Sequence, residues 1–407
     1  MTQAGRQIAF INVAHSLCHY CLLILPTAVL TMAYQGGAFG AEYGPILTLA
    51  TAMFVLYGAL SLPQGWLAAR FGRKAMIATF FLGTGVSLVA CGLATTPFSL
   101  AVALAAVGAF AAIYHPVGTA MLVDAAGDRP GRAIGSNGVF GNFGVALAPV
   151  VTAFLVAHRS WQSAFVLPGL VCTAVGLAWL LVPAFDYTAR RTSRPFPEIP
   201  PHLVRRAVVV LLLIAVVSGL VFNAFTLLIP KLLQERLSGE ALGMLGAAAF
   251  LVTVCGAGTQ FTVGRMIDGH TLRTVFLPLA LVLVPALAAL SVLRGWALLP
   301  VAAVAAAVIF GQVTVNETMT ARYIAPALRA RMYSIRFFVG FLGAASAAPL
   351  VGALHHRTGS LAAVMIVLAV VALVTLGCAF AFPNRREELQ PELWKHSGGG
   401  TAAVAAE

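Results

Sequence analysis

Twelve apolar runs of about 20 residues each dominate this sequence, with short clusters of Arg, Gly and Pro between them. A helix needs about 20 residues to cross the hydrocarbon core of a bilayer. Only 9% of the residues are charged and the mean hydropathy is +0.93, whereas roughly a quarter of an ordinary soluble chain is charged. A water-soluble fold is therefore excluded, and the sequence predicts an all-α polytopic membrane protein.

The twelve predicted transmembrane helices are 8–34, 44–69, 75–95, 98–123, 134–157, 162–184, 207–233, 242–263, 274–293, 297–321, 332–354 and 360–382. An even number of spans places both termini on one face of the membrane. Of the 25 Lys and Arg residues, five lie on the opposite face and Arg336 lies inside a span, so 25 − 5 − 1 = 19 share the face of the termini. The five exceptions are Arg159, Lys231, Arg236, Arg294 and Arg357.

This asymmetry predicts that both termini are cytoplasmic, because cytoplasmic loops of membrane proteins carry the excess of Lys and Arg. We expect a multi-pass protein of the cell inner membrane, in contact with the lipid bilayer. The formal net charge of +12 is explained by topology, so we expect no nucleic-acid partner.

The sequence also predicts two related halves. The proline- and arginine-rich segment 186–206 cannot continue a membrane helix and is interpreted as a cytoplasmic linker between six-helix bundles at 1–185 and 207–383, with a cytoplasmic tail at 384–407. One gapless offset of 343 − 144 = 199 residues aligns the halves at six positions. The aligned pairs are Gly65 with Gly264, Ala69 with Asp268, Lys74 with Arg273, Arg132 with Arg331, Gly141 with Gly340, and Gly144 with Gly343. Parallel repeats of this kind are expected of secondary transporters.

Polar residues inside the spans are the strongest functional signal, because they are costly in lipid. The candidate substrate- and proton-binding residues are His15 and His19 in the first span, His115 in the fourth, Asn142 in the fifth, Asn223 in the seventh, Gln312, Asn316 and Glu317 in the tenth, and Arg336 in the eleventh. Glu317 is the one acidic residue well inside a predicted span.

Depth in the membrane groups these residues. At 1.5 Å rise per residue, His15, His19 and His115 lie about 10, 16 and 14 Å from the cytoplasmic face. Imidazoles titrate near physiological pH, so a cluster at one depth favours a proton-loading site over three separate hydrogen bonds to neighbouring helices. Glu317 and Arg336 both lie about 7 Å from that face, which predicts an ion pair that serves as a clamp or as a proton-coupled switch.

The loop after the second span, GWLAARFGRK, contains Gly65, Arg70, Gly72, Arg73 and Lys74. It resembles the loop motif of the major facilitator superfamily, although the family's aspartate is replaced by Ala69; the second half retains the acid as Asp268 in GRMIDGHTLR. The resemblance implies that spans 1, 4, 7 and 10 line a central cavity and that this loop helps to hold a cytoplasmic gate closed. The alternative is a simple topology anchor.

Three shorter stretches, INVAHSLCH, YHPVGTAM and GVFGNFGVALAP, resemble those of the fosmidomycin-resistance type of exporters. The third stretch contains Asn142. Gly135, just before this stretch, and Gly138 and Gly141 within it lie on one stripe of the fifth span and would let that span approach a neighbouring helix closely. Close packing and substrate contact are both open interpretations of this stripe.

The sequence therefore predicts a secondary active transporter, not an enzyme, that moves a small-molecule organic solute by alternating access with proton-coupled export. One alternative is proton-coupled uptake of a small organic anion. Another is transition-metal transport through the histidines, since His15 and His19 at i and i+4 with His115 could share one ion, although no second carboxylate or Cys cluster completes a coordination shell. We expect no cofactor, no resident metal, and a monomer.

Overall fold

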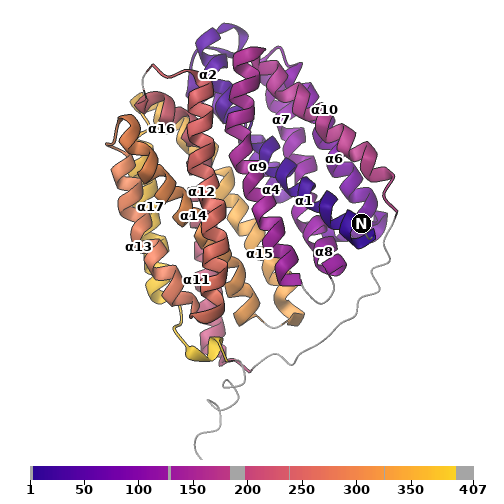
Figure 1. Cartoon of the computed structure of the whole chain (residues 1–407), viewed down its shortest axis with the longest axis vertical. Coiled ribbons are helices and arrows are strands. Elements are labelled where there is room, and N and C mark those ends of the chain that lie inside the picture. Colours follow the sequence, from indigo (N-terminus) through magenta and orange to yellow (C-terminus); the bar gives the residue numbers. More distant parts are fainter. Residues whose placement is uncertain (1–2, 127–129, 184–197, 238, 325, 391–407) are drawn as a thin grey trace, which may run out of the picture.

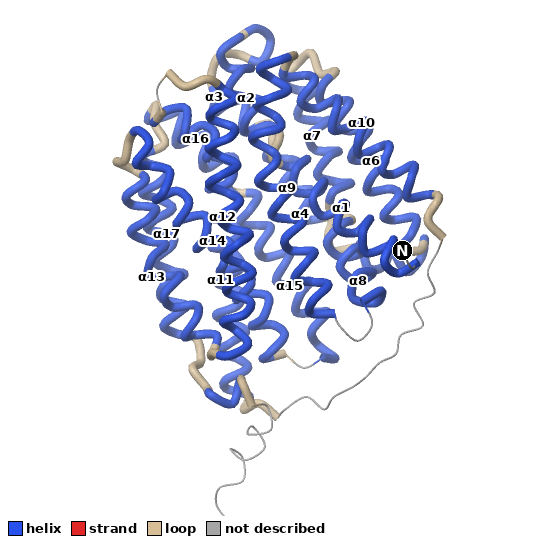
Figure 2. The backbone as a smooth tube through the Cα atoms, viewed as in Figure 1, coloured by secondary structure: helices blue, strands red, loops and turns tan. Residues whose placement is uncertain are grey.

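The computed structural model describes residues 3–126, 130–183, 198–237, 239–324 and 326–390. These residues form helices and loops, without a strand among them (Figures 1 and 2). The N-terminal half consists of α1 (Gln3–Leu22), α2 (Leu25–Gln35), α3 (Tyr43–Thr48), α4 (Thr51–Ala59), α5 (Gln64–Phe71), α6 (Arg73–Gly92), α7 (Pro97–Ala111), α8 (Tyr114–Ala126), α9 (Pro130–His158) and α10 (Trp161–Leu180). The C-terminal half consists of α11 (Pro201–Arg236), α12 (Leu242–Gly269), α13 (Leu272–Leu290), α14 (Leu298–Tyr323), α15 (Pro326–Ala345), α16 (Ala347–Thr358) and α17 (Ala362–Ala381).

Eleven stretches among the described residues are long and apolar enough to cross a membrane, and there are up to twelve if the bent helices of the second span count as one. The second span bends by 64° between Tyr43–Ala59 and Gln64–Phe71. Pro63 lies at this bend, where it precedes the first residue of α5. The predicted all-α membrane fold is confirmed, with the second span bent.

Prolines also account for the breaks in three other predicted spans. Pro26, Pro116 and Pro349 lie in the first turns of α2, α8 and α16, directly after the breaks that separate these helices from α1, α7 and α15. Proline lacks the N–H that would bond to the preceding turn and its ring clashes with that turn, so a helix tends to break just before it. The spans predicted as single helices are thus pairs of shorter ones.

Corresponding glycines permit corresponding close contacts in the two halves. A Cβ on Gly144 of α9 would lie 2.1 Å from the backbone oxygen of Ser16 in α1, and a Cβ on Gly343 of α15 would lie 2.0 Å from that of Val216 in α11. The two glycines are 343 − 144 = 199 residues apart and their partners 216 − 16 = 200 apart, so the same kind of close contact recurs in both halves within one residue of the offset. Gly141 also contacts α1, whereas a Cβ on Gly135 would meet nothing within 4 Å, so the predicted stripe of close approach is wrong at Gly135.

One boundary differs from the sequence prediction. Helix α11 begins at Pro201, so the last residues of the predicted linker 186–206 are helical, with proline in the first turn where its missing N–H costs nothing. The remainder of that linker through 197, and the tail from 391, lie outside the described residues.

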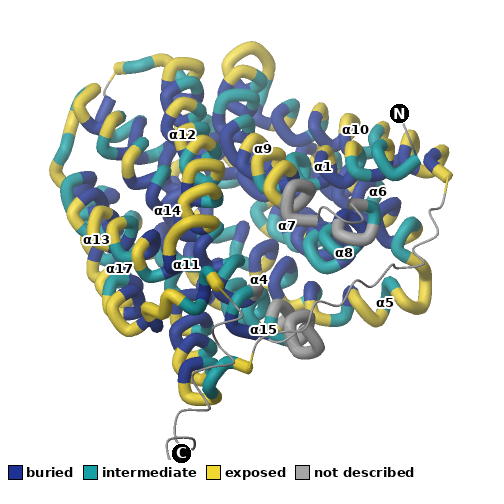
Figure 3. The backbone as a smooth tube through the Cα atoms, turned by 60° about the horizontal axis from the view of Figure 1, so that its bottom comes forward, coloured by how far each residue is buried: buried dark blue, intermediate teal, exposed yellow. Residues whose placement is uncertain are grey.

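The outer surface of the bundle carries large apolar side chains. Val86, Phe154, Leu251 and Val370 are each more than half exposed, and exposed and buried residues share the same helices (Figure 3). In water such a surface would be an aggregation hazard. It is the surface expected of helices that contact lipid.

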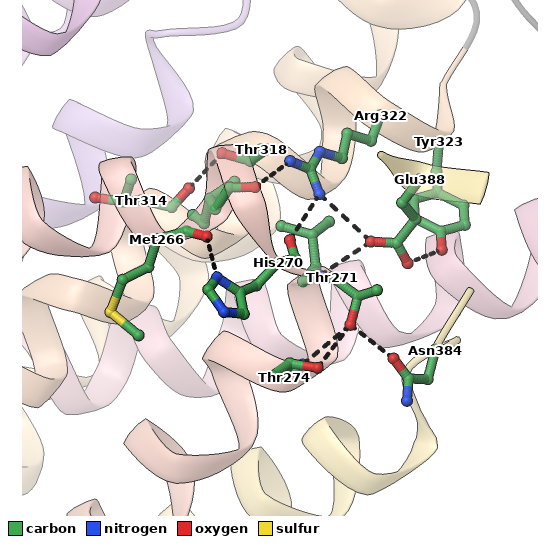
Figure 4. Close-up of polar contacts among 12 residues, drawn as sticks. Met266, His270, Thr271, Thr274, Thr314, Thr318, Arg322, Tyr323, Asn384 and Glu388 are labelled. Carbon is green, nitrogen blue, oxygen red and sulfur yellow. Dashed lines mark hydrogen bonds and ion pairs between the residues drawn. The ribbon is translucent and has the colours of Figure 1, made fainter. Parts of the chain in front are cut away.

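The segment after α17 folds back onto the C-terminal half through Glu388, which is buried (Figure 4). The backbone N–H of Leu272 donates to Glu388 Oε2 over 2.9 Å, and Tyr323 donates its hydroxyl proton to Glu388 Oε1. Arg322 Nη1 lies 3.5 Å from Oε2. Burial raises the pKa of the Glu388 carboxyl, although the hydrogen bonds and Arg322 act in the opposite direction.

We expect Glu388→Ala to destabilise the protein by about 2 kcal/mol, because it leaves the buried donors of Leu272 and Tyr323 without their acceptor. Glu388→Gln keeps one acceptor oxygen and should cost less. Thermal unfolding in detergent measures both losses. Glu387→Ala is the matched control at the neighbouring position, and equal losses at the two positions would show that Glu388 does not anchor this segment.

Candidate functional site

The three intramembrane histidines lie together in the N-terminal half. His15 and His19 come from successive turns of α1, and His115 comes from the start of α8. The Nε2 atoms of His15 and His19 are 3.2 Å apart, and the His115 ring centroid lies 5.2 and 5.4 Å from theirs. His19 and His115 are partly buried. The packing of α1 against α8 thus makes one cluster from residues a hundred positions apart.

Asn137 of α9 holds the cluster in place, and the sequence analysis did not single it out. Its backbone oxygen lies 2.7 Å from His15 Nδ1, which must be the donor because a carbonyl only accepts. Its side-chain nitrogen donates to Asn12 Oδ1 over 2.9 Å, and its Oδ1 accepts from the Tyr114 hydroxyl over 3.1 Å. This network fixes the tautomer of a neutral His15, with Nε2 left as the acceptor that faces His19.

Gly141 and Tyr114 set the position of the His15 ring. A Cβ on Gly141 would lie 2.5 Å from His15 Nε2, so any larger residue there would displace the imidazole. On the other side the ring stacks on Tyr114 with centroids 5.0 Å apart. Gly141 in α9 therefore leaves space for the His15 ring. The glycines of α9 serve this purpose as well as close helix packing.

The predicted ion pair is present in the C-terminal half. Arg336 Nη1 of α15 donates to Glu317 Oε1 of α14 over 2.7 Å, with the Arg336 side chain 11% exposed and the Glu317 side chain 39% exposed. The sequence prediction that Glu317 and Arg336 pair because they lie at equal depth from one face is therefore confirmed.

Phe337 connects this pair to the histidines. Its ring centroid lies 5.9 Å from that of His115, and the guanidinium carbon of Arg336 lies 5.5 Å from the same ring. The histidine cluster and the ion pair, which belong to different halves, therefore meet through one aromatic side chain.

The amide candidates have three different environments. Gln312 and Asn316 are buried one turn apart on α14, and Gln312 Nε2 and Asn316 Oδ1 have no hydrogen-bond partner among the described residues. Asn223 donates to Gly219 O of its own helix over 2.9 Å. Asn142 of α9 donates to Gln260 Oε1 of α12, which makes it a contact between the two halves. Of these four amides, the α14 pair are the ones with fully buried polar atoms that lack a partner among the described residues.

The predicted gating residues lie at the end of the bundle near the N-terminus. Gly65 and Arg70 on α5 are exposed, and so is Asp268 on α12. Gly72 has a φ of +85°, which explains why glycine separates α5 from α6. Lys74 Nζ donates to Leu180 O over 3.0 Å, a contact within the N-terminal half. Arg73 begins α6 directly after Gly72.

We expect Ala69→Asp to favour closure of this end, because it restores the carboxylate of the family motif at an exposed position of α5. Cysteine labelling from the cytoplasmic side should then slow. Ala69→Asn is the uncharged control. An unchanged labelling rate for the aspartate variant would mean that the loop is only a topology anchor.

A second set of contacts joins the halves at the opposite end, and the sequence analysis did not identify it. His356 Nδ1 of α16 lies 2.5 Å from Glu42 Oε2, before α3. Within the C-terminal half, His355 Nε2 lies 2.7 Å from Glu235 Oε1. The His355 ring contacts the N-terminal half, with its centroid 5.2 Å from that of Tyr43. The sequence analysis missed these residues because they lie at the ends of spans, where polar residues are common. The available signal was that acidic residues are scarce in this chain, 13 in all.

The fold and site define a polytopic membrane protein of two repeated helical halves with polar residues at their shared centre. Residues 16–317 match the sequence model of the Major Facilitator Superfamily. The chain belongs to this superfamily of transporters.

Two curated relatives match 150 residues each. The "Probable sulfoacetate transporter SauU" of Cupriavidus necator is 31% identical over 35% of this chain and 34% of its own length. The "Puromycin resistance protein pur8" of Streptomyces alboniger is 29% identical over 36% of this chain and 30% of its own length. The matched region spans about a third of either relative.

Solved structures share the fold over nearly the whole chain. A bacterial homolog of the human lysosomal transporter Spinster, in an inward-facing and unoccupied conformation, has a TM-score of 0.70 at 14% identity and covers 99% of this chain and 100% of its own. A D-xylose-proton symporter has a TM-score of 0.74 at 13% identity, covering 94% of this chain and 98% of its own. At these identities the likeness concerns the fold alone.

Proposed function

We propose that this chain is a proton-coupled secondary transporter of the bacterial inner membrane that exports a small organic solute by alternating access, with both termini in the cytoplasm. The observation that carries the proposal is the cluster of His15, His19 and His115. An imidazole gains and loses a proton near neutral pH, and three of them lie together inside a transporter fold. The cluster is the site at which protons load and leave.

The contact through Phe337 gives protonation a way to affect the other half. A protonated His115 is attracted to the face of an aromatic ring, and its nearest ring across the two halves is that of Phe337, 5.9 Å away. Phe337 in turn is next to Arg336 and its pair with Glu317. Loading a proton would thus strengthen one contact between the halves, and releasing it would weaken that contact.

Gln312 and Asn316 are the proposed polar contacts of the solute. Their Nε2 and Oδ1 atoms are a buried donor and a buried acceptor without partners among the described residues, and such atoms are costly unless something satisfies them. A solute that carries both a hydrogen-bond acceptor and a donor would do so.

Uptake of a small organic anion is the second candidate, and the relative described as a probable sulfoacetate transporter favours it. The relative described as a puromycin resistance protein favours export. In the structure the charge of Arg336 is neutralised by Glu317, so an anion would have to open this pair or use protonated histidines as its counter-charge. This difference is why we place export first.

Transport in proteoliposomes tests both candidates. A panel of small sulfonates, carboxylates, phosphonates and puromycin is offered with a pH gradient imposed in either direction. If the protein exports solute in exchange for protons, the solute should move in the direction opposite to proton flow. If it takes up an anion together with protons, the solute should move in the same direction as the protons. A transported solute whose rate ignores both gradients would contradict proton coupling.

A further inference from the structure

The histidine cluster also has the geometry of a metal site. Each histidine offers one ring nitrogen such that the three nitrogens lie within 4.8 Å of one another. Three imidazoles form a complete set of protein ligands for Zn²⁺ in sites that leave the fourth position open. A second carboxylate or a cysteine is therefore not needed to complete the protein's share of the shell.

The spacing of the nitrogens is close to that of ligands around one ion. Two nitrogens bound tetrahedrally at about 2.05 Å are about 3.3 Å apart, and the Nε2 atoms of His15 and His19 are 3.2 Å apart. The three nitrogens lie within 4.8 Å of one another, so no separation would have to shorten by more than about 1.5 Å.

The hydrogen bond that His15 makes through Nδ1 is of the kind that metal-binding histidines make. Metal-binding histidines usually donate their other ring N–H to a carboxylate or a backbone carbonyl, which fixes the tautomer and the ring orientation. His15 Nδ1 donates to the Asn137 carbonyl over 2.7 Å, and Asn137 is held by Asn12 and Tyr114. The lone pair of Nε2 therefore faces the cluster before any ion arrives.

The ligand types select the class of ion. The cluster consists of imidazoles, without a carboxylate or thiolate among its three members. Mg²⁺ and Ca²⁺ require oxygen ligands, whereas imidazole suits Zn²⁺, Cu²⁺ and Ni²⁺.

We propose that His15, His19 and His115 form a binding site for a divalent transition-metal ion of the Zn²⁺ class. Binding requires the three Nε2 or Nδ1 lone pairs, so His19 must carry its remaining proton on the ring nitrogen that faces away from the ion. Protons and the metal compete for the same lone pairs. The proposal concerns equilibrium binding and is independent of what the protein transports.

Calorimetric titration of Zn²⁺ into chelator-treated, purified protein in detergent tests the site. We expect one ion per chain, an affinity at least tenfold lower for His15→Ala or for His115→Ala, and an affinity at least tenfold lower at pH 5.5 than at pH 7.5. His158→Ala and His202→Ala are the matched controls at exposed histidines outside the cluster and should leave the affinity unchanged. Full affinity in the triple variant His15→Ala, His19→Ala, His115→Ala would overturn the site.

X-ray absorption on the unmutated protein avoids any dependence on how the variants fold. A shell with three nitrogen ligands at about 2.0 Å supports the site, and a shell made only of oxygen overturns it. Since neither measurement involves transport, failure of proton coupling in proteoliposomes leaves this result intact, and absence of metal leaves the transport result intact.

Discussion

Replacing His115 by alanine is expected to reduce pH-driven transport to background. His115 is the member of the cluster that contacts both His15 and His19 and, across the two halves, Phe337. Removing its imidazole deletes the group that would carry the proton and breaks the ring contact between the cluster and Phe337 of α15. Transport in proteoliposomes with an imposed pH gradient measures the effect.

Two controls separate loss of coupling from loss of fold. His158→Ala and His202→Ala alter histidines at exposed positions of α9 and α11 and should leave pH-driven transport unchanged. Solute exchange without a pH gradient, together with thermal unfolding, reports whether the His115→Ala protein is folded and binds solute. Normal pH-driven transport by this variant would remove His115 from the coupling site.

The second large effect is expected at the ion pair between Glu317 and Arg336. Removing one partner of a fully buried pair costs roughly 3 to 5 kcal/mol, because the other charge is left in a medium of low dielectric. The Glu317 side chain is 39% exposed, so screening by water lowers this, and we expect about 1 to 2 kcal/mol for Glu317→Ala. Thermal unfolding in detergent measures the loss.

The two single variants should differ, because their stranded charges differ in exposure. Glu317→Ala removes the carboxylate partner of a guanidinium whose side chain is 11% exposed, whereas Arg336→Ala removes one partner of the more exposed carboxylate. Glu317→Ala should therefore be the more destabilising. The double variant removes both charges and should recover stability towards the unmutated protein while transport stays low.

A strictly additive double-mutant cycle would show that the two side chains are not coupled. Glu317 would then be a carboxylate that acts independently of Arg336, and it would replace the histidines as the leading candidate for the proton carrier. Arg357→Ala, at an exposed arginine of α16, is the control for loss of a positive charge.

Much of the architecture was predictable from the sequence, because in lipid the length of an apolar run and the placement of basic residues constrain a helix strongly. The breaks in the first, second, fourth and eleventh spans were not predicted as such. Their prolines were visible, but whether a proline bends a membrane helix or divides it depends on which neighbours satisfy the freed backbone groups.

The sequence by itself determined the spans, the repeat and the depth of each polar residue, since depth follows from counting residues at a fixed rise per residue. Depth was enough to pair Glu317 with Arg336 and to place three histidines at one level. Only the tertiary structure decided which way each helix is rotated about its axis, and therefore that Asn137 holds His15 and that Glu42 meets His356. Rotation is set by packing between helices, through close contacts such as that of Gly141 with His15, and these join residues far apart in the chain.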